Sequence, residues 1–386
     1  MKILILTDGI SPFVIGGMQK HSFYLAKFLA MRDHEVTLVH CVPSGKNLPT
    51  QEETVAAMEL SDNHLFKSIA LHFPQAGVMP GHYLKESYQY SQNIYARIKE
   101  DLLDFDFVYV KGFAGWHLLV EKNKGTKMPP IGIKFHGYEM FQPPASFKSR
   151  IHHWLLQGPV KWNNKNSDFI FSYGGKITPL IESIGIRREK IIEIPTGIES
   201  NWLRKGWLPS KSDKVNFLFI GRFERRKGIE ELNKVLVSLV DKMNFQFHFV
   251  GPIPPSKKIK STSITYHGTI SELNELQKIL DTCQVLVVPS HSEGMPNVIM
   301  EGMARGLAIV ATDVGAISVV VDAENGWLIK PASVDALEVA LTEVINLGSD
   351  QLAIRQKNSL LKIQNFFWEN VAKQVEDEIQ RIIKVS

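Results

Sequence analysis

Short runs of apolar residues alternate with longer stretches of helical periodicity along the whole chain. The runs in the first half are Ile3–Leu6, Val36–Val39, Phe107–Val110, Ile131–Phe135, Phe169–Phe171 and Ile191–Ile194, and those in the second half are Val215–Ile220, Phe245–Val250, Ile264–His267, Val285–Val288, Ala308–Ala311 and Trp327–Ile329. Continuous apolar strands separated by helices are typical of parallel sheets with both faces covered. The pattern therefore predicts an α/β protein with two doubly wound sheets in tandem.

The length agrees with two domains, because 386 residues exceed what one ordinary hydrophobic core organises. Between Pro195 and Lys214 the residues Pro, Gly, Ser and Lys replace the periodic apolar positions, which predicts a linker. We place the domains at residues 1–204 and 205–365. Helical periodicity returns over Ser333–Leu347, Gln351–Ile363 and Trp368–Lys384, and residues 366–386 are predicted to form a terminal helix.

The composition excludes several classes of protein. Hydrophobic residues make up 44% and charged residues 22%, and the net charge of +4 is too small to indicate nucleic-acid binding, although a local basic face could meet phosphates. The two cysteines, Cys41 and Cys283, lie among strand-like residues and predict buried thiols in a reducing compartment, without disulfide or zinc. No apolar run has the length of a signal peptide or a membrane span, so we expect a cytoplasmic protein.

The segment Ser290–Gly306 places two carboxylates, Glu293 and Glu301, on either side of a turn that opens a helix. Pro296 suits the first helical turn, and Gly306 suits the left-handed residue that ends a helix. The free N–H groups at the start of the helix favour a phosphate or a polarised sugar oxygen, while the carboxylates accept hydrogen bonds from hydroxyls. The segment therefore predicts a sugar-nucleotide site.

The segment Ile220–Gly228 follows the first strand of the second half and leads into a helix. A glycine at the end of that strand lets the backbone turn under a ligand. Arg222 and Lys227 then offer a guanidinium fork and a point charge to a diphosphate. Arg225 and Arg226 are expected to be solvated.

Two loops of the first half add candidates. Gly16 and Gly17 follow the first strand, but the loop is not Gly-x-Gly-x-x-Gly, which counts against a nicotinamide dinucleotide enzyme. His136 comes directly after another strand, at the carboxyl edge where ligands of parallel sheets bind, with Lys134 and Glu139 beside it. A satisfied loop histidine is the alternative.

Taken together, Glu-(seven residues)-Glu with Gly-x-Pro-Asn inside it, Gly-Arg-(four residues)-Lys-Gly, and the Gly-Gly loop resemble the retaining GT-B glycosyltransferases, especially glycosyltransferase family 4. The resemblance implies that Glu293 holds hydroxyls of the donor sugar and Glu301 the ribose. It also implies that Arg222 and Lys227 neutralise the departing diphosphate in place of a metal, and that His136 contacts the donor sugar.

The resemblance extends to the architecture and to further positions. It implies two Rossmann-like domains facing a central cleft, with the C-terminal helix crossing back to the N-terminal domain. The further substrate-binding positions that it implies are Gly16, Gly17, Gly294, Met295, Pro296, Asn297, Val298, Thr269 and Ile270. The chain departs from the family at Gly302, where alanine is usual, and at Gly315-Ala316, where the family has Gly-Gly.

The predicted function is metal-independent, retaining transfer of a hexose-type sugar from a nucleotide-diphosphate sugar to an acceptor hydroxyl. We expect a UDP-sugar as donor and a saccharide or lipid-linked acceptor, in polysaccharide, lipopolysaccharide or related glycan synthesis, without a cofactor or nucleic acid. A sugar-nucleotide 2-epimerase and a non-catalytic sugar-nucleotide-binding protein are the alternatives. Asp104-Phe-Asp106 has the spacing of a metal-chelating pair, but its place before a strand favours a turn.

The segment Pro143–Gln157 has apolar residues on one helical face, namely Phe147, Ile151, Trp154 and Leu155, with Lys148, Arg150, His152 and His153 beside or opposite them. One interpretation is a helix that faces the core of the first domain. The other is a basic, aromatic face in peripheral contact with an anionic membrane, on its inner side.

Overall fold

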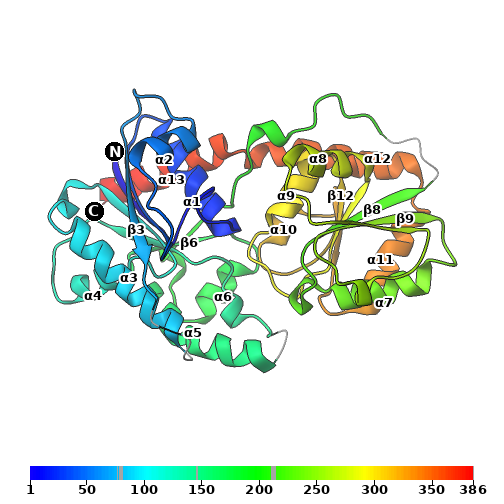
Figure 1. Ribbon diagram of the computed structural model, residues 1–386, viewed down its shortest axis with the longest axis horizontal. Coiled ribbons are helices and arrows are strands. Elements are labelled where there is room, and N and C mark those ends of the chain that lie inside the picture. Colours follow the sequence, from blue (N-terminus) through cyan, green and yellow to red (C-terminus); the bar gives the residue numbers. More distant parts are fainter. Residues whose placement is uncertain (76, 78–80, 145–146, 210–213, 386) are drawn as a thin grey trace. The chain divides into compact units, whose positions relative to one another are not determined.

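The computed structural model describes residues 1–75, 77, 81–144, 147–209 and 214–385 (Figure 1). The chain divides into two compact units, the first made of Met1–Phe141, Arg150–Gly197 and Trp368–Ser386 and the second of Gln142–Ser149 and Ile198–Phe367. The predicted architecture of two tandem α/β domains is confirmed. The predicted boundary after residue 204 lies inside the second unit.

The first unit contains a parallel sheet with the strand order β3-β2-β1-β4-β5-β6-β7. Its strands are β1 (Lys2–Leu6), β2 (Glu35–Pro43), β3 (Phe66–Phe73), β4 (Phe107–Lys111), β5 (Ile131–Lys134), β6 (Phe169–Ser172) and β7 (Ile191–Glu193). The strand β3 was not predicted, because it is partly exposed and its apolar residues are interrupted by Lys67, Ser68 and His72. The other six strands match predicted runs.

The helices of the first unit are α1 (Gly17–Ala30), α2 (Gln51–Met58), α3 (His82–Ile98), α4 (Trp116–Asn123), α5 (Phe147–Asn166, of which Arg150–Asn166 belong to this unit), α6 (Ile177–Ser183) and α13 (Trp368–Val385). The last helix, α13, lies beside α1 in Figure 1 and shares one apolar core with it. Trp368, which opens α13, is buried with its ring centroid 5.8 Å from that of Tyr24. A Cβ on Gly197 would lie 2.6 Å from the Trp368 ring, so only glycine fits where the chain leaves this unit.

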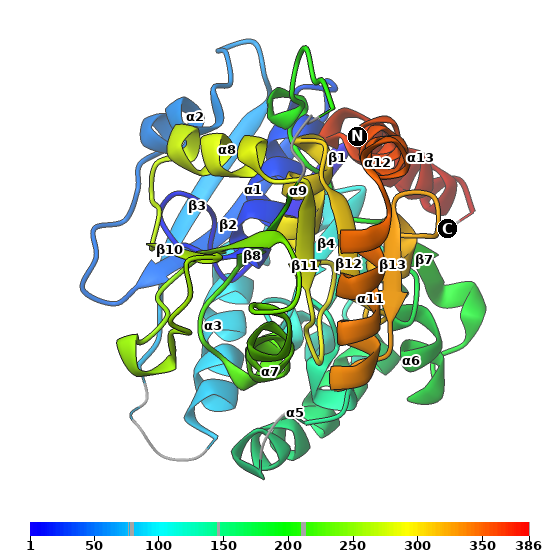
Figure 2. The same cartoon turned by 90° about the vertical axis from the view of Figure 1, so that its right-hand side faces the viewer.

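The second unit contains a parallel sheet with the order β10-β9-β8-β11-β12-β13, part of which faces the viewer in Figure 2. Its strands are β8 (Val215–Ile220), β9 (Phe245–Val250), β10 (Ile264–Gly268), β11 (Val285–Val288), β12 (Ala308–Thr312) and β13 (Gly326–Ile329). Its helices are α7 (Ile229–Leu239), α8 (Leu273–Thr282), α9 (Asn297–Ala304), α10 (Ile317–Val320), α11 (Val334–Asn346) and α12 (Ser349–Ile363). All six strands were predicted, because each is rich in apolar residues, although in β9 the polar residues Gln246 and His248 alternate with buried phenylalanines.

Each sheet has a position where the strand order reverses direction, between β1 and β4 in the first unit and between β8 and β11 in the second. Loops that leave the carboxyl ends of such neighbouring strands diverge and open a crevice, which is where open α/β sheets bind ligands. The Gly16-Gly17 loop leaves β1, the Arg222 loop leaves β8 and the Glu293 loop leaves β11. The topology therefore supports the first of these loops as a candidate binding loop of the first unit, and the other two as candidate binding loops of the second.

No helix in the described residues combines the length and the low charge that crossing a bilayer requires.

Candidate functional site

The loops that follow β8 and β11 touch one another in the second unit. Gly228 has a positive φ of 68°, and a Cβ there would lie 1.8 Å from the carbonyl oxygen of Pro289. The backbone N–H of His291 donates to the carbonyl of Arg226 at 2.7 Å. Any residue larger than glycine at position 228 would force the two loops apart.

This contact brings together two side chains predicted from separate motifs, Lys227 and Glu293. The Lys227 Nζ donates to Glu293 Oε1 at 2.7 Å, and the Ser290 hydroxyl donates to the same oxygen at 2.8 Å. Arg226 Nη1 lies 3.4 Å from the other carboxylate oxygen. Glu293 is only 6% exposed, so these donors hold its carboxylate in one orientation.

Arg225 and Arg226 are partly exposed, with 39% and 28% of their side chains accessible, but both also form ion pairs that the sequence did not predict. Arg225 forms an ion pair with the buried Glu231, with 2.6 Å between Nη2 and Oε1, and donates to Nε2 of His291 at 3.0 Å. Arg226 contacts Glu293 and also donates to the carbonyl of Ser292 at 3.2 Å. Both arginines therefore connect the loop after β8 to neighbouring residues. In the sequence, only their position directly before Lys227 indicated that they belong to the site.

Arg222 lies at the start of the same loop but points to solvent. Its side chain is 69% exposed and pairs with Glu224 at 2.9 Å. An exposed pair of this kind is weak, so a ligand phosphate can compete for the guanidinium. Its role at a diphosphate stays a prediction.

The segment after Glu293 leads into α9, which begins at Asn297 with Pro296 just outside it as the N-cap residue. No side chain caps this end in the described residues. Close contacts surround Gly302, where the chain departs from the family pattern, and Gly315, the glycine that it keeps from the Gly-Gly pair. A Cβ on Gly302 would lie 2.9 Å from the Leu286 side chain, and one on Gly315 would lie 2.2 Å from the Glu293 carbonyl oxygen. Gly315 therefore keeps the turn packed against Glu293.

The other candidates of the second unit lie at the same sheet edge. Glu301 is half-buried within α9, and Met295 is buried. Thr269 and Ile270 follow β10, with Thr269 exposed. Gly294 accepts a hydrogen bond from the N–H of Ala316 at 2.7 Å. Nothing in these contacts assigns a ligand to them, so their substrate-binding roles stay predictions.

His136 lies in the first unit, just beyond β5, as predicted. Its Nδ1 is 2.7 Å from the hydroxyl of Tyr173, which follows β6. Burial lowers the pKa of His136 well below its usual value, and the charges of Lys111 and Lys134 lower it further. The imidazole is therefore neutral at physiological pH. Sequence reasoning did not identify Tyr173, because its relation to His136 depends on two strands meeting side by side.

Gly16 and Gly17 are also in the first unit, where Gly17 is the first residue of α1 and Gly16 its N-cap. Gly16 has an extended backbone, and a Cβ there would meet the flexible end of Gln19 at 2.1 Å. The neighbouring Ile15 is 96% exposed. These residues and His136 belong to one unit and the donor candidates to the other, so a shared cleft remains a prediction.

Lys111 ends β4 with its amine buried and without a hydrogen-bond partner in the described part of the chain. Burial lowers the pKa of Lys111 to about 7, while Asp8 opposes the shift. The unfolded chain keeps its lysine pKa near about 10.4, so between these values it binds more protons than the folded protein. Folding free energy should therefore become more favourable as the pH rises through this window.

We expect the free energy of unfolding to rise between pH about 7 and about 9.5, with at most about 1.4 kcal/mol per pH unit from Lys111. Lys134, whose pKa is also lowered by burial, acts in the same direction. Lys111→Met should remove its share of the slope while keeping the side-chain volume. Urea unfolding at several pH values measures both slopes, and equal slopes would rule out a buried, titrating Lys111.

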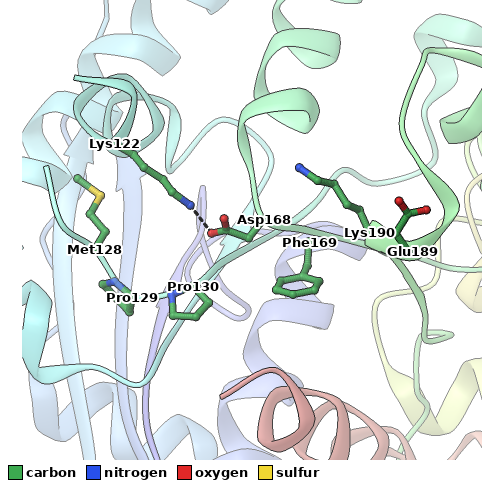
Figure 3. A pocket seen from close by; sticks show the side chains of 8 residues that line it. All are labelled: Lys122, Met128, Pro129, Pro130, Asp168, Phe169, Glu189 and Lys190. Atoms are coloured by element: carbon green, nitrogen blue, oxygen red, sulfur yellow. Dashed lines mark hydrogen bonds and ion pairs between the residues drawn. The ribbon is translucent and has the colours of Figure 1, made fainter. Parts of the chain in front are cut away.

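A cavity of about 490 Å³ lies elsewhere in the first unit (Figure 3). Pro130 precedes β5, Phe169 opens β6 and Lys190 precedes β7, so the cavity borders the amino ends of these strands. Lys122 and Asp168 form an ion pair across it, and Asp168 also accepts from the N–H of Ile131 at 2.8 Å. These contacts connect α4 to the starts of β5 and β6. They lie at the amino edge of the sheet, whereas the candidate residues lie at its carboxyl edge.

The Asp104-Phe-Asp106 segment forms a turn before β4. Asp106 Oδ2 accepts from the backbone N–H of Lys2 at 2.7 Å, which fixes the start of β1 beside β4. Within the described ranges no group of three or more His, Cys, Asp or Glu side chains is arranged to hold a metal ion.

Two tandem doubly wound sheets with candidate residues at their carboxyl edges define a protein of the GT-B fold class. Residues 15–202 match the family model described as Glycosyltransferase Family 4, and residues 214–346 match the one described as Glycosyl transferases group 1. The chain belongs to this family of glycosyltransferases, as its motifs predicted.

Known proteins agree with this assignment. The N,N'-diacetylbacillosaminyl-diphospho-undecaprenol alpha-1,3-N-acetylgalactosaminyltransferase of Campylobacter jejuni is 26% identical over 298 residues, which cover 72% of this chain and 75% of that enzyme. The sucrose-phosphate synthase of Thermosynechococcus elongatus has a TM-score of 0.75 at 18% identity, covering 100% of this chain and 99% of the synthase. Anabaena HepE in complex with UDP has a TM-score of 0.66 at 16% identity, covering 99% and 100%. The two structural likenesses establish the fold alone.

Proposed function

We propose that the protein transfers a hexose-type sugar, with retention, from a nucleotide-diphosphate sugar to an acceptor hydroxyl in cell-surface glycan synthesis. The observation that carries this proposal is the contact of Lys227 with Glu293, supported by Ser290. It places a cation suited to a diphosphate beside a carboxylate suited to sugar hydroxyls, next to the start of α9.

In this reaction the bond between the anomeric carbon and the diphosphate oxygen breaks. Positive charge grows on the sugar ring and negative charge on the diphosphate, and the protein must stabilise both. Lys227, Arg222 and the N–H groups at the start of α9 would receive the diphosphate charge. Glu293 would hold sugar hydroxyls and not attack carbon, because three donors already engage its carboxylate. The acceptor hydroxyl would attack on the face of the leaving group and pass its proton to the departing diphosphate oxygen.

Two of the known proteins named above support particular substrates. HepE was solved in complex with UDP, which supports a UDP-sugar donor here. The Campylobacter relative is named for a diphospho-undecaprenol acceptor, which supports a saccharide on a lipid carrier. A lipid-linked acceptor would bring the protein to a membrane, and we propose its inner face as the place.

A transfer assay tests the proposal. The protein is screened against UDP-sugars with and without lipid-linked and soluble saccharide acceptors, and the product's anomeric configuration is read by NMR. A nucleotide that binds should also raise the unfolding free energy by about 2.7 kcal/mol at 100 times its dissociation constant. A changed sugar nucleotide without acceptor would indicate the 2-epimerase. Binding without any turnover would indicate a non-catalytic protein.

Activity is expected to survive EDTA. Lys227 and Arg222 supply the charge that a divalent cation supplies in metal-dependent transferases, and Asp106 is engaged with the start of β1. The assay compares turnover after EDTA treatment with turnover after adding back Mg²⁺ or Mn²⁺. Loss of activity that either ion restores would overturn metal independence.

We further propose that α5 contacts the membrane. Its residues Ile151 and Trp154 are 51% and 71% exposed, so the interpretation of a core-facing helix is wrong for these two. The helix contains no acidic residue, while Arg150 and Lys161 are basic and exposed. The side chains of Phe147 and Lys148 lie outside the described residues. An apolar face with basic neighbours suits an anionic bilayer surface.

Liposome flotation should show binding that requires anionic lipid and weakens as salt is added. Trp154→Ala should reduce binding by removing apolar area, and Lys148→Glu with Arg150→Glu should abolish it at moderate salt. Arg187→Glu, in the same unit and exposed, is the matched charge control. Failure of the wild-type protein to bind anionic liposomes at low salt would indicate a soluble acceptor.

A further inference from the structure

Three side chains meet at the carboxyl edge of β5 and β6 in the first unit. Lys134 ends β5, His136 follows two residues later, and Tyr173 follows β6. The Tyr173 hydroxyl is 2.7 Å from Nδ1 of His136, and the two rings pack edge to face with centroids 5.3 Å apart. The contact is therefore both a short hydrogen bond and a packing contact that restrains the imidazole ring.

The direction of this hydrogen bond follows from what else Tyr173 can reach. Tyr173 is 1% exposed, and its hydroxyl has no second partner in the described part of the chain. If Nδ1 carried a proton, the tyrosine O–H would be buried without an acceptor, which costs about 1–3 kcal/mol. Tyr173 therefore donates, Nδ1 accepts, and the ring proton of His136 resides on Nε2.

The charged and titratable groups around His136 keep this arrangement neutral. Burial lowers the pKa of His136 most, and Lys111 on β4 or Lys134 on β5, when protonated, would repel a proton on the ring and lower this pKa further. Lys134 Nζ lies 3.8 Å from the centre of the Tyr173 ring and donates to the carbonyl of Ile194 at 3.0 Å. His21 on α1 has its own pKa lowered well below the usual value by burial, so it adds no charge.

The opposite side of the His136 ring is open. The residue is half-buried, and its Nε2 is neither hydrogen bonded nor sealed from solvent within the described ranges. A neutral imidazole with an outward Nε2–H can donate a hydrogen bond to an oxygen but cannot accept a proton at that atom. His136 is thus equipped to polarise or hold an oxygen and not to act as a general base.

We propose that Tyr173 is a positioning residue that fixes His136 as its Nε2–H tautomer, so that His136 donates a hydrogen bond to an oxygen of the bound substrate. The role in turnover rests on the proposed glycosyl transfer, whereas the tautomer is a property of the protein by itself. The two claims can therefore fail separately.

The first test is NMR of the protein with ¹⁵N-labelled histidine, with His136 assigned through the signal lost in His136→Gln. Nδ1 should resonate as an unprotonated nitrogen and Nε2 as a protonated one. Tyr173→Phe should mix the two tautomers. Tyr138→Phe is the matched control, because Tyr138 is equally buried and its hydroxyl donates to Asn164 at 2.8 Å instead of to His136.

The second test is turnover with the donor identified for the protein. Tyr173→Phe should lower kcat by about tenfold, the loss expected from one neutral hydrogen bond, with little change in the donor KM. Tyr138→Phe should retain kcat. A protonated Nδ1 in the wild-type spectrum, or a Tyr173→Phe variant with unchanged tautomer and kcat, would overturn the proposal. A wild-type protein with the expected tautomer but no transfer activity would overturn the function alone.

Discussion

Lys227→Ala and Arg222→Ala are each expected to lower kcat/KM for sugar transfer by roughly 10²–10³-fold, as the loss of one preorganised charge donor does elsewhere. Lys227 is held in place by its 2.7 Å contact with Glu293, so its ammonium needs no reorganisation when diphosphate charge develops. Arg222 must leave its exposed pair with Glu224 first. We therefore expect the loss to be larger for Lys227.

The measurement is steady-state transfer with the donor varied, together with the melting temperature of each variant to confirm folding. Lys234→Ala is the matched control, since Lys234 is an exposed lysine on α7 of the same unit. Its kcat/KM should stay within about twofold of the wild type, as surface substitutions remote from a site usually do. Near-full activity in both site variants would remove the diphosphate assignment.

Most of the fold was predictable because parallel strands buried on both faces leave unbroken apolar runs. The exception shows the limit of that signal. In β3 the residues Lys67 and His72 are exposed and interrupt the apolar run. The other edge strands, β7, β10 and β13, were predicted, so the apolar pattern fails where polar residues divide the run and not at sheet edges in general.

The backbone of the donor site was predictable for a different reason. Glycine is required at positions 228 and 315, because any Cβ there would lie less than 2.5 Å from a backbone atom. These glycines therefore indicate the loop geometry in the sequence itself. The sequence does not indicate which side chains pair with one another in these loops. Arg225 and Arg226 look alike in the sequence, yet one pairs with Glu231 and the other with Glu293, 67 residues along the chain.

The same limit applies to the surroundings of His136. Tyr173 and Lys111 lie 37 and 25 residues from it, on neighbouring strands, and no spacing rule connects them. Only the strand order brings β4, β5 and β6 side by side and so collects these side chains at one edge. For α5, periodicity located the apolar stripe but not its exposure, and the exposed Trp154 argues only against a core-facing stripe at that position.

Glu293→Gln should damage sugar recognition far more than nucleotide binding. We expect kcat/KM for the donor to fall by roughly 10²-fold, because the amide NH2 that replaces the second carboxylate oxygen cannot accept a hydrogen bond from Arg226 or from a sugar hydroxyl. The dissociation constant of free UDP should change by less than about threefold, since the carboxylate is assigned to the sugar end of the ligand.

Glu301→Ala should give the opposite pattern, because its carboxylate, half-buried within α9, is assigned to the ribose. Each hydrogen bond to a charged acceptor contributes about 1.5–3 kcal/mol, so its loss should lower the affinity for free UDP by roughly 10-fold or more. Calorimetric titration of UDP against both variants, beside donor kinetics, separates the two roles. Glu324→Ala, on an exposed turn of the same unit, is the control and should change neither value. Equal losses of UDP affinity in Glu293→Gln and Glu301→Ala would contradict the division of the two carboxylates between sugar and nucleotide.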